Sequence, residues 1–446
     1  MPRRKRSSIV LLLLTCWLLV LGVRCTSSTP TPISAAFPTR VLADLPTRIV
    51  TDTPTFTPRP TRTPTPTPTP TVTPTPTITP RPPATDPWFA PMMTSDDELA
   101  TLDDYWNGEA MWVIEIKDVG LPVGESDTVH RSGPIFWSYL HADSRSAGIR
   151  DSCGDSVPYP GCVTLWKSHN GGKSFFLERP ECLFPCDRCP CDEDDHVEQQ
   201  QYPRVFFDVN DFAYMVYEWG AGTFMRTSPN GFQWSGEIGI PGTGVWYDTQ
   251  RPCTDAERIK THPNVYSGLE YDCLAGAPPG IYIEDDLLYV FIGLGRAPGH
   301  MGCLVGNKYE GAVGLEPCEA NPLFGTKNGY GPEDAFGAEA NAYFDFRTIS
   351  SADVVRVGER YYMAYEGTRG PTSHAVREDQ FALGFARTIS PTIDGPWETF
   401  PGNPAVTDVG DYWGIGHADL VIYQGTTYMY SSTSPETRGR YVLVKK

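Results

Sequence analysis

Apolar and polar residues alternate in one hairpin pattern that occurs four times along the chain. Each copy is a short β-rich run, a polar or glycine-containing turn, and a second run with an aromatic and apolar centre. The copies occupy residues 205–218, 281–293, 354–366 and 420–432. Aligned on the tyrosine of the second run, they are 75, 73 and 66 residues apart, measured between Tyr214, Tyr289, Tyr362 and Tyr428. A four-stranded sheet with its loops needs about that length of chain, so the repeat predicts a β-propeller.

An additional blade precedes the first of these hairpins. The segment 165–176 has a basic residue, a Ser or Thr, a glycine turn and an aromatic residue in the same order as segments 224–234 and 381–398. We therefore predict an all-β fold, a five-bladed β-propeller. Its blades are expected near residues 129–180, 200–240, 278–310, 350–400 and 415–446. The remaining strand at 111–116 is expected to complete the last blade and close the ring, which avoids an open sheet edge.

The segment ahead of the propeller divides into two parts. Residues 1–26 have the layout of a signal peptide or membrane anchor, with basic residues at 3–6 and an apolar run at 9–23. That run is shorter than a typical membrane span of about 20 residues. Cleavage, lipidation at Cys25 and retention as an anchor all stay open. The prediction is export to an extracellular or cell-surface location, with membrane contact only through this segment.

Residues 27–88 form a Thr/Pro-rich tract. Between Thr51 and Pro80, 14 residues are Thr and 10 are Pro. Proline fixes φ and removes backbone donors, so we expect a disordered, extended stalk without a packed core. Residues 89–446 are then predicted to form one propeller domain, and we expect it to be a monomer.

Charge and cysteine content narrow the class of protein. A formal net charge of −18 argues against nucleic acid and anionic membrane surfaces as main partners. Close sequence pairs predict three disulfides, Cys153–Cys162, Cys253–Cys273 and Cys303–Cys318, as expected in an oxidising compartment. Four further cysteines lie together in one loop and form either two disulfides or, with His196, a zinc site: Cys182, Cys186, Cys189 and Cys191. The acidic run 192–195 is expected to be a solvated loop.

The last two predicted blades resemble a known family. Tyr361–Gly367, Gly384–Arg387 and Asp394–Trp397, followed by Gly414–Leu420 and Thr427–Tyr430, look like segments of the five-bladed propeller glycoside hydrolases. That group includes arabinanases, β-xylosidases and fructan-cleaving enzymes. The resemblance implies a carbohydrate partner and hydrolysis of glycosidic bonds. Segment 168–175 also resembles a degraded Asp-box, a structural turn of sialidase-type propellers.

Propeller geometry selects the candidate residues. Starts of first strands and ends of second strands converge at one mouth of the central funnel. This rule gathers His130, Arg131, Arg204, Glu218, Arg296, Asp353, Glu366, His417 and Asp419. Asp353 and Asp419 each lie nine residues before their anchor tyrosines and are expected to be equivalent.

Glycoside hydrolysis needs one carboxylic acid and one carboxylate. We expect Glu366 to be the acid and Asp353 or Asp419 to be the base. Expected substrate-binding residues are Arg131, Arg204, Glu218, Arg296 and His417. No metal or cofactor is predicted, apart from an optional ion or water on the axis near His417.

One departure from the family keeps other functions open. The family's base usually lies on the first blade's inner strand in an Asp-Pro context, whereas the run expected there, 130–137, has no carboxylate. Asp127 is the nearest and is expected in a loop. The main alternative is therefore a non-catalytic carbohydrate-binding or adhesion propeller on a stalk. A third hypothesis is recognition of an acidic sugar by the arginines, although sialidase propellers have six blades and the count here is five.

Overall fold

The computed structural model describes residues 90–446 except 123, 143–147, 158–160, 187–188, 192–199, 220–221, 241–277, 294–299, 326–343, 346–347, 369–380, 406–416 and 435–436. The predicted segments 1–26 and 27–88 lie outside the described residues. In the described part, no helix combines the length and apolar character that a membrane crossing requires.

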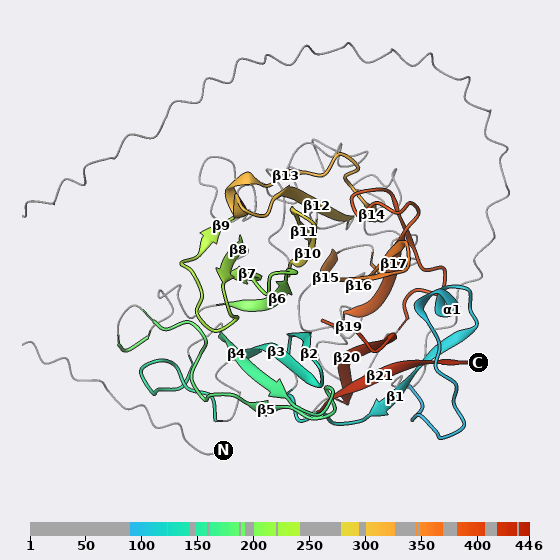
Figure 1. Ribbon diagram of the computed structural model, residues 1–446, viewed down its shortest axis with the longest axis horizontal. Coiled ribbons are helices and arrows are strands. Elements are labelled where there is room, and N and C mark those ends of the chain that lie inside the picture. Colours follow the sequence, from blue (N-terminus) through green and yellow to red (C-terminus); the bar gives the residue numbers. More distant parts are fainter. Residues whose placement is uncertain are drawn as a thin grey trace, which may run out of the picture. The chain divides into compact units, whose positions relative to one another are not determined.

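Five antiparallel sheets account for almost all of the regular structure (Figure 1). Blade 1 consists of β2 (Ser126–Ser132), β3 (Ile135–Ala142), β4 (Cys162–Ser168) and β5 (Phe176–Leu177). Blade 2 consists of β6 (Gln201–Phe207), β7 (Ala213–Trp219), β8 (Gly222–Ser228) and β9 (Ile238–Gly239). Blade 3 consists of β10 (Gly280–Glu284), β11 (Leu287–Gly293), β12 (His300–Asn307) and β13 (Glu316–Pro317), with β14 (Phe324–Gly325) also pairing β12 and the 3-10 turn η2 at Gly311–Gly314.

The last two blades follow the same order. Blade 4 consists of β15 (Thr348–Val357), β16 (Arg360–Thr368), β17 (Ala382–Thr388) and β18 (Trp397–Thr399). Blade 5 consists of β19 (Asp419–Tyr423), β20 (Thr426–Ser434), β21 (Thr437–Lys445) and β1 (Ala110–Ile116). The pairing of β1 with β21 runs from Ala110 opposite Lys445 to Ile116 opposite Arg440. It confirms that the first strand completes the last blade.

The inner strands form a closed ring around the axis. β2 contacts β6 and β19, β10 contacts β6 and β15, and β15 contacts β19. This ring, with one sheet radiating from each inner strand, confirms the predicted five-bladed β-propeller (Figure 1).

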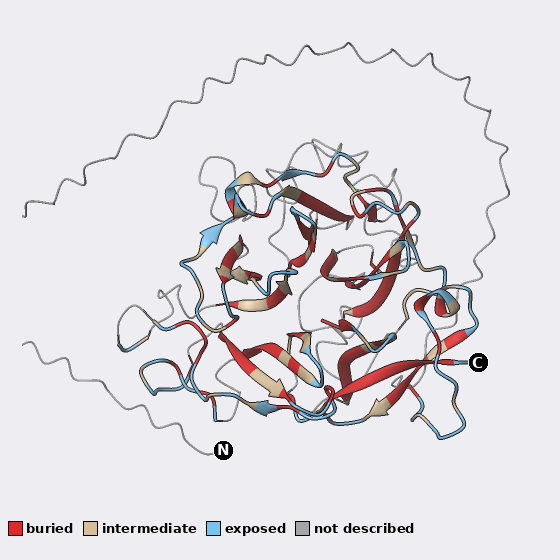
Figure 2. Ribbon diagram, viewed as in Figure 1, coloured by how far each residue is buried: buried red, intermediate tan, exposed pale blue. Residues whose placement is uncertain are grey.

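Core packing lies between neighbouring blades. Figure 2 shows buried residues along the strands of every blade. Between blades 3 and 4, Phe291 and Tyr289 join Tyr361 and Met363 in one buried cluster. Large aromatic side chains are suited to this layer because each removes a wide apolar surface from water.

The short helix α1 (Leu102–Trp106) covers the junction of blades 4 and 5. Thr101 and Asp104 form a capping box that satisfies backbone donors at its start. The helix buries Leu102 and Tyr105, and the Tyr105 ring lies 5.5 Å from the ring of Phe385.

The Asp-box-like turn after β4 and the matching turn after β8 have a structural role. In the turn after β4, the Ser168 hydroxyl accepts a hydrogen bond from the backbone N–H of Gly172. The Asn170 side-chain oxygen there accepts from the N–H groups of Lys173 and Ser174, at 3.1 and 3.0 Å. The turn after β8 repeats this arrangement with Ser228 and Asn230. An asparagine therefore supplies the acceptor that the missing aspartate would supply.

The disulfides agree only partly with prediction. Cys303–Cys318 is confirmed. The predicted pair Cys153–Cys162 is wrong, because each of these cysteines pairs instead with a cysteine of the segment between β5 and β6. The observed pairs there are Cys153–Cys189, Cys162–Cys182 and Cys186–Cys191. The predicted pair Cys253–Cys273, His196 and the acidic run 192–195 lie outside the described residues.

Candidate functional site

The strand registers define one equivalent position on each inner strand. Its residue lies opposite Tyr139, Val216, Phe291, Ala364 or Tyr430 on the second strand. The five residues at this position, which we call the axial ring, are Asp127, Arg204, Gly280, Asp353 and Asp419. The expected equivalence of Asp353 and Asp419 is confirmed by these registers.

Asp127 belongs to this ring, so the expected inner strand at 130–137 is wrong. β2 begins at Ser126, and the chain reverses at Gly133 between β2 and β3. Asp127 therefore lies within the inner strand and not in a loop. The apolar character of residues 135–137 belongs to the second strand of the hairpin.

Arg204 is the centre of the axial ring. Its guanidinium is 2 % exposed, and its Nη1 lies 3.0 Å from Asp419 Oδ1 and 3.5 Å from Asp127 Oδ1. Nη1 also donates to the carbonyl of Ser126, and Nη2 donates to the Ser351 hydroxyl at 2.9 Å. Arg204 thus joins blades 1, 2, 4 and 5. These contacts give Arg204 a structural role, and its expected role in substrate binding stays a prediction.

Asp419 is also committed to internal contacts. It is wholly buried, with Oδ1 on Arg204 and Oδ2 accepting from the Ser126 hydroxyl at 2.7 Å. Arg438 Nη2 lies 3.0 Å from the same Oδ2. These contacts occupy both carboxylate oxygens of Asp419, and its expected role as a base stays a prediction.

Asp127 and Asp353 link neighbouring inner strands. The Asp127 carboxylate accepts a hydrogen bond from the backbone N–H of Val205, and the Asp353 carboxylate accepts from that of Leu420. Burial and the charges of neighbouring aspartates raise the pKa of Asp127 well above its usual range. Burial likewise raises the pKa of Asp353 to about 6, although Arg204 opposes this shift. Asp353 is partly exposed, so it stays available as a base.

A second set of equivalent positions lies closer to the mouth. Each member follows the second-strand partner of an axial-ring residue by two positions, and the members are His141, Glu218, Gly293, Glu366 and Ser432. Glu218 lies opposite Gln201, and Glu366 lies opposite Ser350. The expected correspondence of Glu218 and Glu366 is therefore confirmed.

Glu366 is a buried carboxyl group beside an imidazole. It is 2 % exposed, and its Oε1 accepts from the Ser350 hydroxyl at 2.7 Å. Its Oε2 lies 3.5 Å from His417 Nε2. Burial, together with the negative charge of Glu125, raises the pKa of Glu366 to about 7, against the opposing effect of Ser350. A large part of this group is therefore protonated at neutral pH.

His417 lies between Glu366 and a second carboxylate, Glu125. Its Nε2 is 3.8 Å from Glu125 Oε1, and its ring stacks on Tyr202 with centroids 4.8 Å apart and planes 4° apart. Tyr202 and His417 both have left-handed backbone conformations, with φ of 54° and 52°, at equivalent positions before Arg204 and Asp419. Ser351 occupies that position in blade 4 with φ of 54°.

The hydrogen bonds of His417 indicate its tautomer. The Ser351 hydroxyl accepts from Arg204 Nη2 and lies 2.5 Å from His417 Nδ1. Among the described residues, Nδ1 is the acceptor in reach of that hydroxyl proton, so the imidazole proton is assigned to Nε2. Burial, with the charges of Arg204 and Arg438, lowers the pKa of His417 to about 3. The ring is therefore neutral and directs an N–H toward Glu125 and Glu366.

Glu125 is the more accessible of the two glutamates. Its side chain is 30 % exposed, and its Oε2 lies 3.0 Å from His141 Nδ1. Burial opposes ionisation, but the His141 hydrogen bond lowers the pKa of Glu125 below its usual range. The mouth thus holds an ionised Glu125 and a largely protonated Glu366 on the same imidazole edge. Glu125 could have been identified from the sequence. It lies two positions before Asp127, just as His417 lies two positions before Asp419.

Arg131 and His130 do not join this mouth, contrary to expectation. They lie near the β2–β3 turn, at the opposite end of β2 from Asp127. Arg131 pairs with Asp211 at 2.6 Å, and its guanidinium lies 3.2 Å from the ring centre of Phe207. The expected site residue Arg296 lies outside the described residues.

Among the described residues of the mouth, no group of side chains meets the geometry of a metal site. In the part of the chain that the structure describes, the His, Cys, Asp or Glu group close enough to hold an ion is Cys153, Cys186 and Cys191 of blade 1. At His417, both ring nitrogens face protein groups.

Comparison with known proteins gives structural similarities at low sequence identity. No protein-family model and no curated protein sequence matches the chain. A thermostable family-43 glycoside hydrolase is 16 % identical, with 73 % of this chain and 89 % of that chain covered and a TM-score of 0.43. The catalytic domain of Coprinopsis cinerea GH62 α-L-arabinofuranosidase is 12 % identical, with 80 % and 97 % covered and a TM-score of 0.42.

The Cellvibrio cellulosa α-L-arabinanase, complexed with arabinohexaose, is also similar. It is 12 % identical, with 72 % of this chain and 91 % of that chain covered and a TM-score of 0.42. The five-bladed architecture rests on the strand pairings described above, and no residue of this chain takes its role from these similarities.

Proposed function

We propose that this protein hydrolyses glycosidic bonds at the mouth that contains Glu125, Glu366 and His417. The observation that carries the proposal is the pairing of two carboxyl groups with opposite protonation on one imidazole edge. A glycoside hydrolase needs such a pair, since one group protonates the leaving oxygen and the other activates water or attacks. The glycan class of substrate follows from the family resemblance of segments 361–397 and 414–430.

Glu366 is assigned as the general acid. Its pKa of about 7 keeps a proton available near neutral pH, and its contact with Ser350 fixes one carboxyl oxygen. Glu125 is assigned as the base, in place of Asp419. It is ionised and accessible, and His141 orients it. Asp353 is the rival base, because it is partly exposed in the axial ring.

His417 is a positioning residue in this scheme. Its neutral ring accepts a hydrogen bond from the Ser351 hydroxyl at Nδ1 and directs Nε2–H toward both glutamates. His417 Nε2 lies near both carboxyl groups, and an N–H directed at a carboxyl group favours its ionised form. The stacked Tyr202 ring keeps the imidazole plane in place.

The disulfides support the proposed location of the protein. Disulfides are typical of oxidising compartments, so the pairs in blades 1 and 3 support an exported protein that works outside the cell.

The test is an activity panel with matched variants. Wild type, Glu366→Gln, Glu125→Gln and Asp353→Asn are assayed on arabinan, xylan and fructan oligosaccharides, with binding measured by calorimetry. We expect losses of about 10²–10⁴-fold in turnover for Glu366→Gln and Glu125→Gln. Glu359→Gln, an exposed residue in the β15–β16 turn, is the control and is expected to retain full activity.

Each other outcome identifies a different mechanism. Loss of turnover in Asp353→Asn with retention in Glu125→Gln would move the base to Asp353. Glycan binding by the wild type without turnover would place the protein among binding propellers. Wild-type hydrolysis that survives Glu366→Gln would refute the site.

A further inference from the structure

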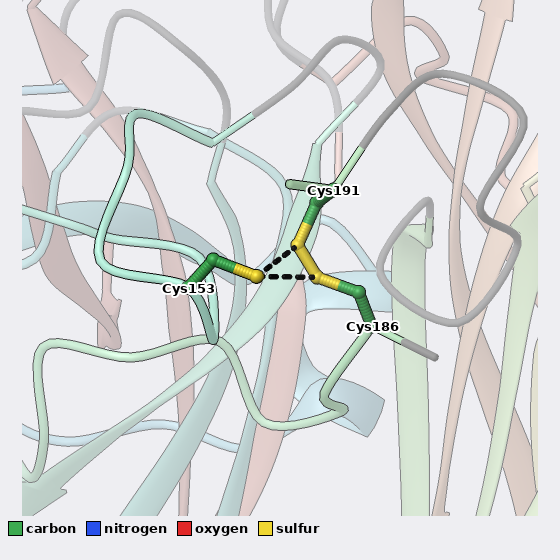
Figure 3. A group of neighbouring side chains, drawn as sticks. All are labelled: Cys153, Cys186 and Cys191. Atoms are coloured by element: carbon green, nitrogen blue, oxygen red, sulfur yellow. Dashed lines mark hydrogen bonds between the residues drawn. A yellow bond between two sulfur atoms is a disulfide. The ribbon is translucent and has the colours of Figure 1, made fainter. Parts of the chain in front are cut away.

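Four cysteines from two loops of blade 1 bring their sulfur atoms together. Cys153 lies in the loop between β3 and β4, and Cys186, Cys189 and Cys191 lie in the loop between β5 and β6. Cys153 pairs with Cys189, and Cys186 pairs with Cys191. Figure 3 shows the Cys153 side chain directed at both sulfurs of the second pair. We call these four residues the sulfur cluster.

Two distances across the sulfur cluster match those of a tetrahedral site. Cys153 Sγ lies 3.8 Å from Cys186 Sγ and 3.5 Å from Cys191 Sγ. In a tetrahedral zinc site with Zn–S bonds of about 2.3 Å, neighbouring sulfurs are about 3.8 Å apart. Two disulfides satisfy their sulfurs separately and do not require the pairs to meet. Cys153 Sγ nevertheless contacts both sulfurs of the second pair while it is bonded to Cys189, so all four cysteines lie within reach of one ion once the two disulfides are reduced.

Hydrogen bonds to Asp151 and Ser152 hold the backbone near Cys153 and Cys186 in place. The Asp151 carboxylate accepts hydrogen bonds from the N–H groups of Cys153 and Asp155, at 2.9 and 2.8 Å. The Ser152 hydroxyl accepts from the N–H of Cys186 at 3.0 Å and lies 3.0 Å from Cys186 Sγ. A hydroxyl donor beside a sulfur stabilises its thiolate form and supports metal ligation.

Exposure separates the sulfur cluster from the other disulfides. Cys153, Cys186 and Cys191 are partly exposed. Cys162, Cys182, Cys303 and Cys318 are all 3 % exposed or less. A reductant in solution therefore reaches the sulfur cluster first.

We propose that the sulfur cluster binds one zinc ion when its two disulfides are reduced. A phosphine reductant reduces each S–S bond to two thiols, with water supplying the phosphine oxide oxygen and the two protons. The four thiols then release four protons as their thiolates bind one Zn²⁺. Cys182 is excluded from this ligand set because it pairs with Cys162, so the set differs from the zinc site that the sequence indicates by the exchange of Cys182 for Cys153.

The experiment uses the purified full-length chain treated briefly with tris(2-carboxyethyl)phosphine. Co²⁺, a spectroscopic substitute for Zn²⁺, is then titrated in. We expect one equivalent to bind, with the intense visible bands of tetrahedral cobalt thiolate, and Zn²⁺ to displace it. Cys153→Ser and Cys191→Ser are expected to weaken binding by at least tenfold, while Cys303→Ser with Cys318→Ser leaves it unchanged.

Alkylation mapping keeps the test decisive if a variant is unstable. In the reduced wild type, zinc is expected to protect Cys153, Cys186, Cys189 and Cys191 from iodoacetamide and to leave any other reduced cysteine reactive. No metal binding by the reduced chain, or zinc protection of a different set of cysteines, overturns the proposal.

Discussion

Replacement of Glu366 by glutamine is expected to stabilise the fold in alkaline solution. Glu366 is almost wholly buried, and its folded-state pKa is about 7, compared with an ordinary value of 4.5. A carboxyl group with a raised pKa stabilises the fold fully below its unfolded value. That contribution is lost as the pH rises from 4.5 through about 7, because the folded state binds more protons over that window.

The magnitude follows from the shift. One pKa unit corresponds to about 1.4 kcal/mol, so the difference from 4.5 to about 7 corresponds to about 3 kcal/mol at pH 8. Glutamine is neutral at every pH and avoids this cost. Glu366→Gln is therefore expected to be about 3 kcal/mol more stable than the wild type at pH 8, and within about 0.5 kcal/mol of it at pH 4.

The assay is urea unfolding of both proteins at several pH values between 4 and 8. Glu359→Gln, in the exposed turn of the same hairpin, is the control and is expected to change stability by less than about 0.5 kcal/mol throughout. A Glu366→Gln stability difference that does not grow with pH would refute the assignment of a raised pKa to this carboxyl group.

Three other changes test the framework of the site. Arg204→Met is expected to cost about 3–5 kcal/mol at pH 7 because it removes the cation that the buried Asp127 and Asp419 share; a loss under about 1 kcal/mol by urea unfolding would contradict the central role of Arg204. Gly280→Ala is expected to cost about 1–3 kcal/mol, since a Cβ there would lie 2.4 Å from the Ala352 carbonyl oxygen. Gly236→Ala, with nothing within 4 Å, is its control, and equal thermal stability of the two variants would argue against tight packing of the axial ring. Removal of Cys303–Cys318, which spans 15 residues, is expected to cost about 3 kcal/mol in the same assay; unchanged stability would mean that this disulfide does not constrain the unfolded chain.

The fold was predictable because its signal is repeated. The alternation in each hairpin and the common tyrosine place four of the inner strands, and the turn sequences add the fifth blade. The register of the first blade was less accessible. Its hairpin has an anchor at Trp137 and one extra residue at an irregularity between His130 and Ser132, so Asp127 lies ten residues before its anchor and not nine.

The site was predictable only in part. The sequence gives the position of a residue within the repeat, but it does not give the side chains that surround that residue in the fold. Equivalent offsets correctly grouped Asp353 with Asp419 and Glu218 with Glu366. Offsets alone do not reveal that Arg204 occupies the centre of the ring and pairs with Asp127 and Asp419. The disulfides of blade 1 were missed for a related reason, since their loops meet only once the sheet is formed.

The measurement that tests the central claim most directly is the leaving-group dependence of Glu366→Gln. Wild type and variant are compared on a natural oligosaccharide and on the 2,4-dinitrophenyl glycoside of the same sugar. A sugar leaving group needs a proton from the acid, whereas dinitrophenolate leaves without one. We predict a loss of about 10²–10⁴-fold in kcat on the oligosaccharide and a much smaller loss on the dinitrophenyl glycoside. Equal losses on both substrates would contradict the role of Glu366 as the general acid.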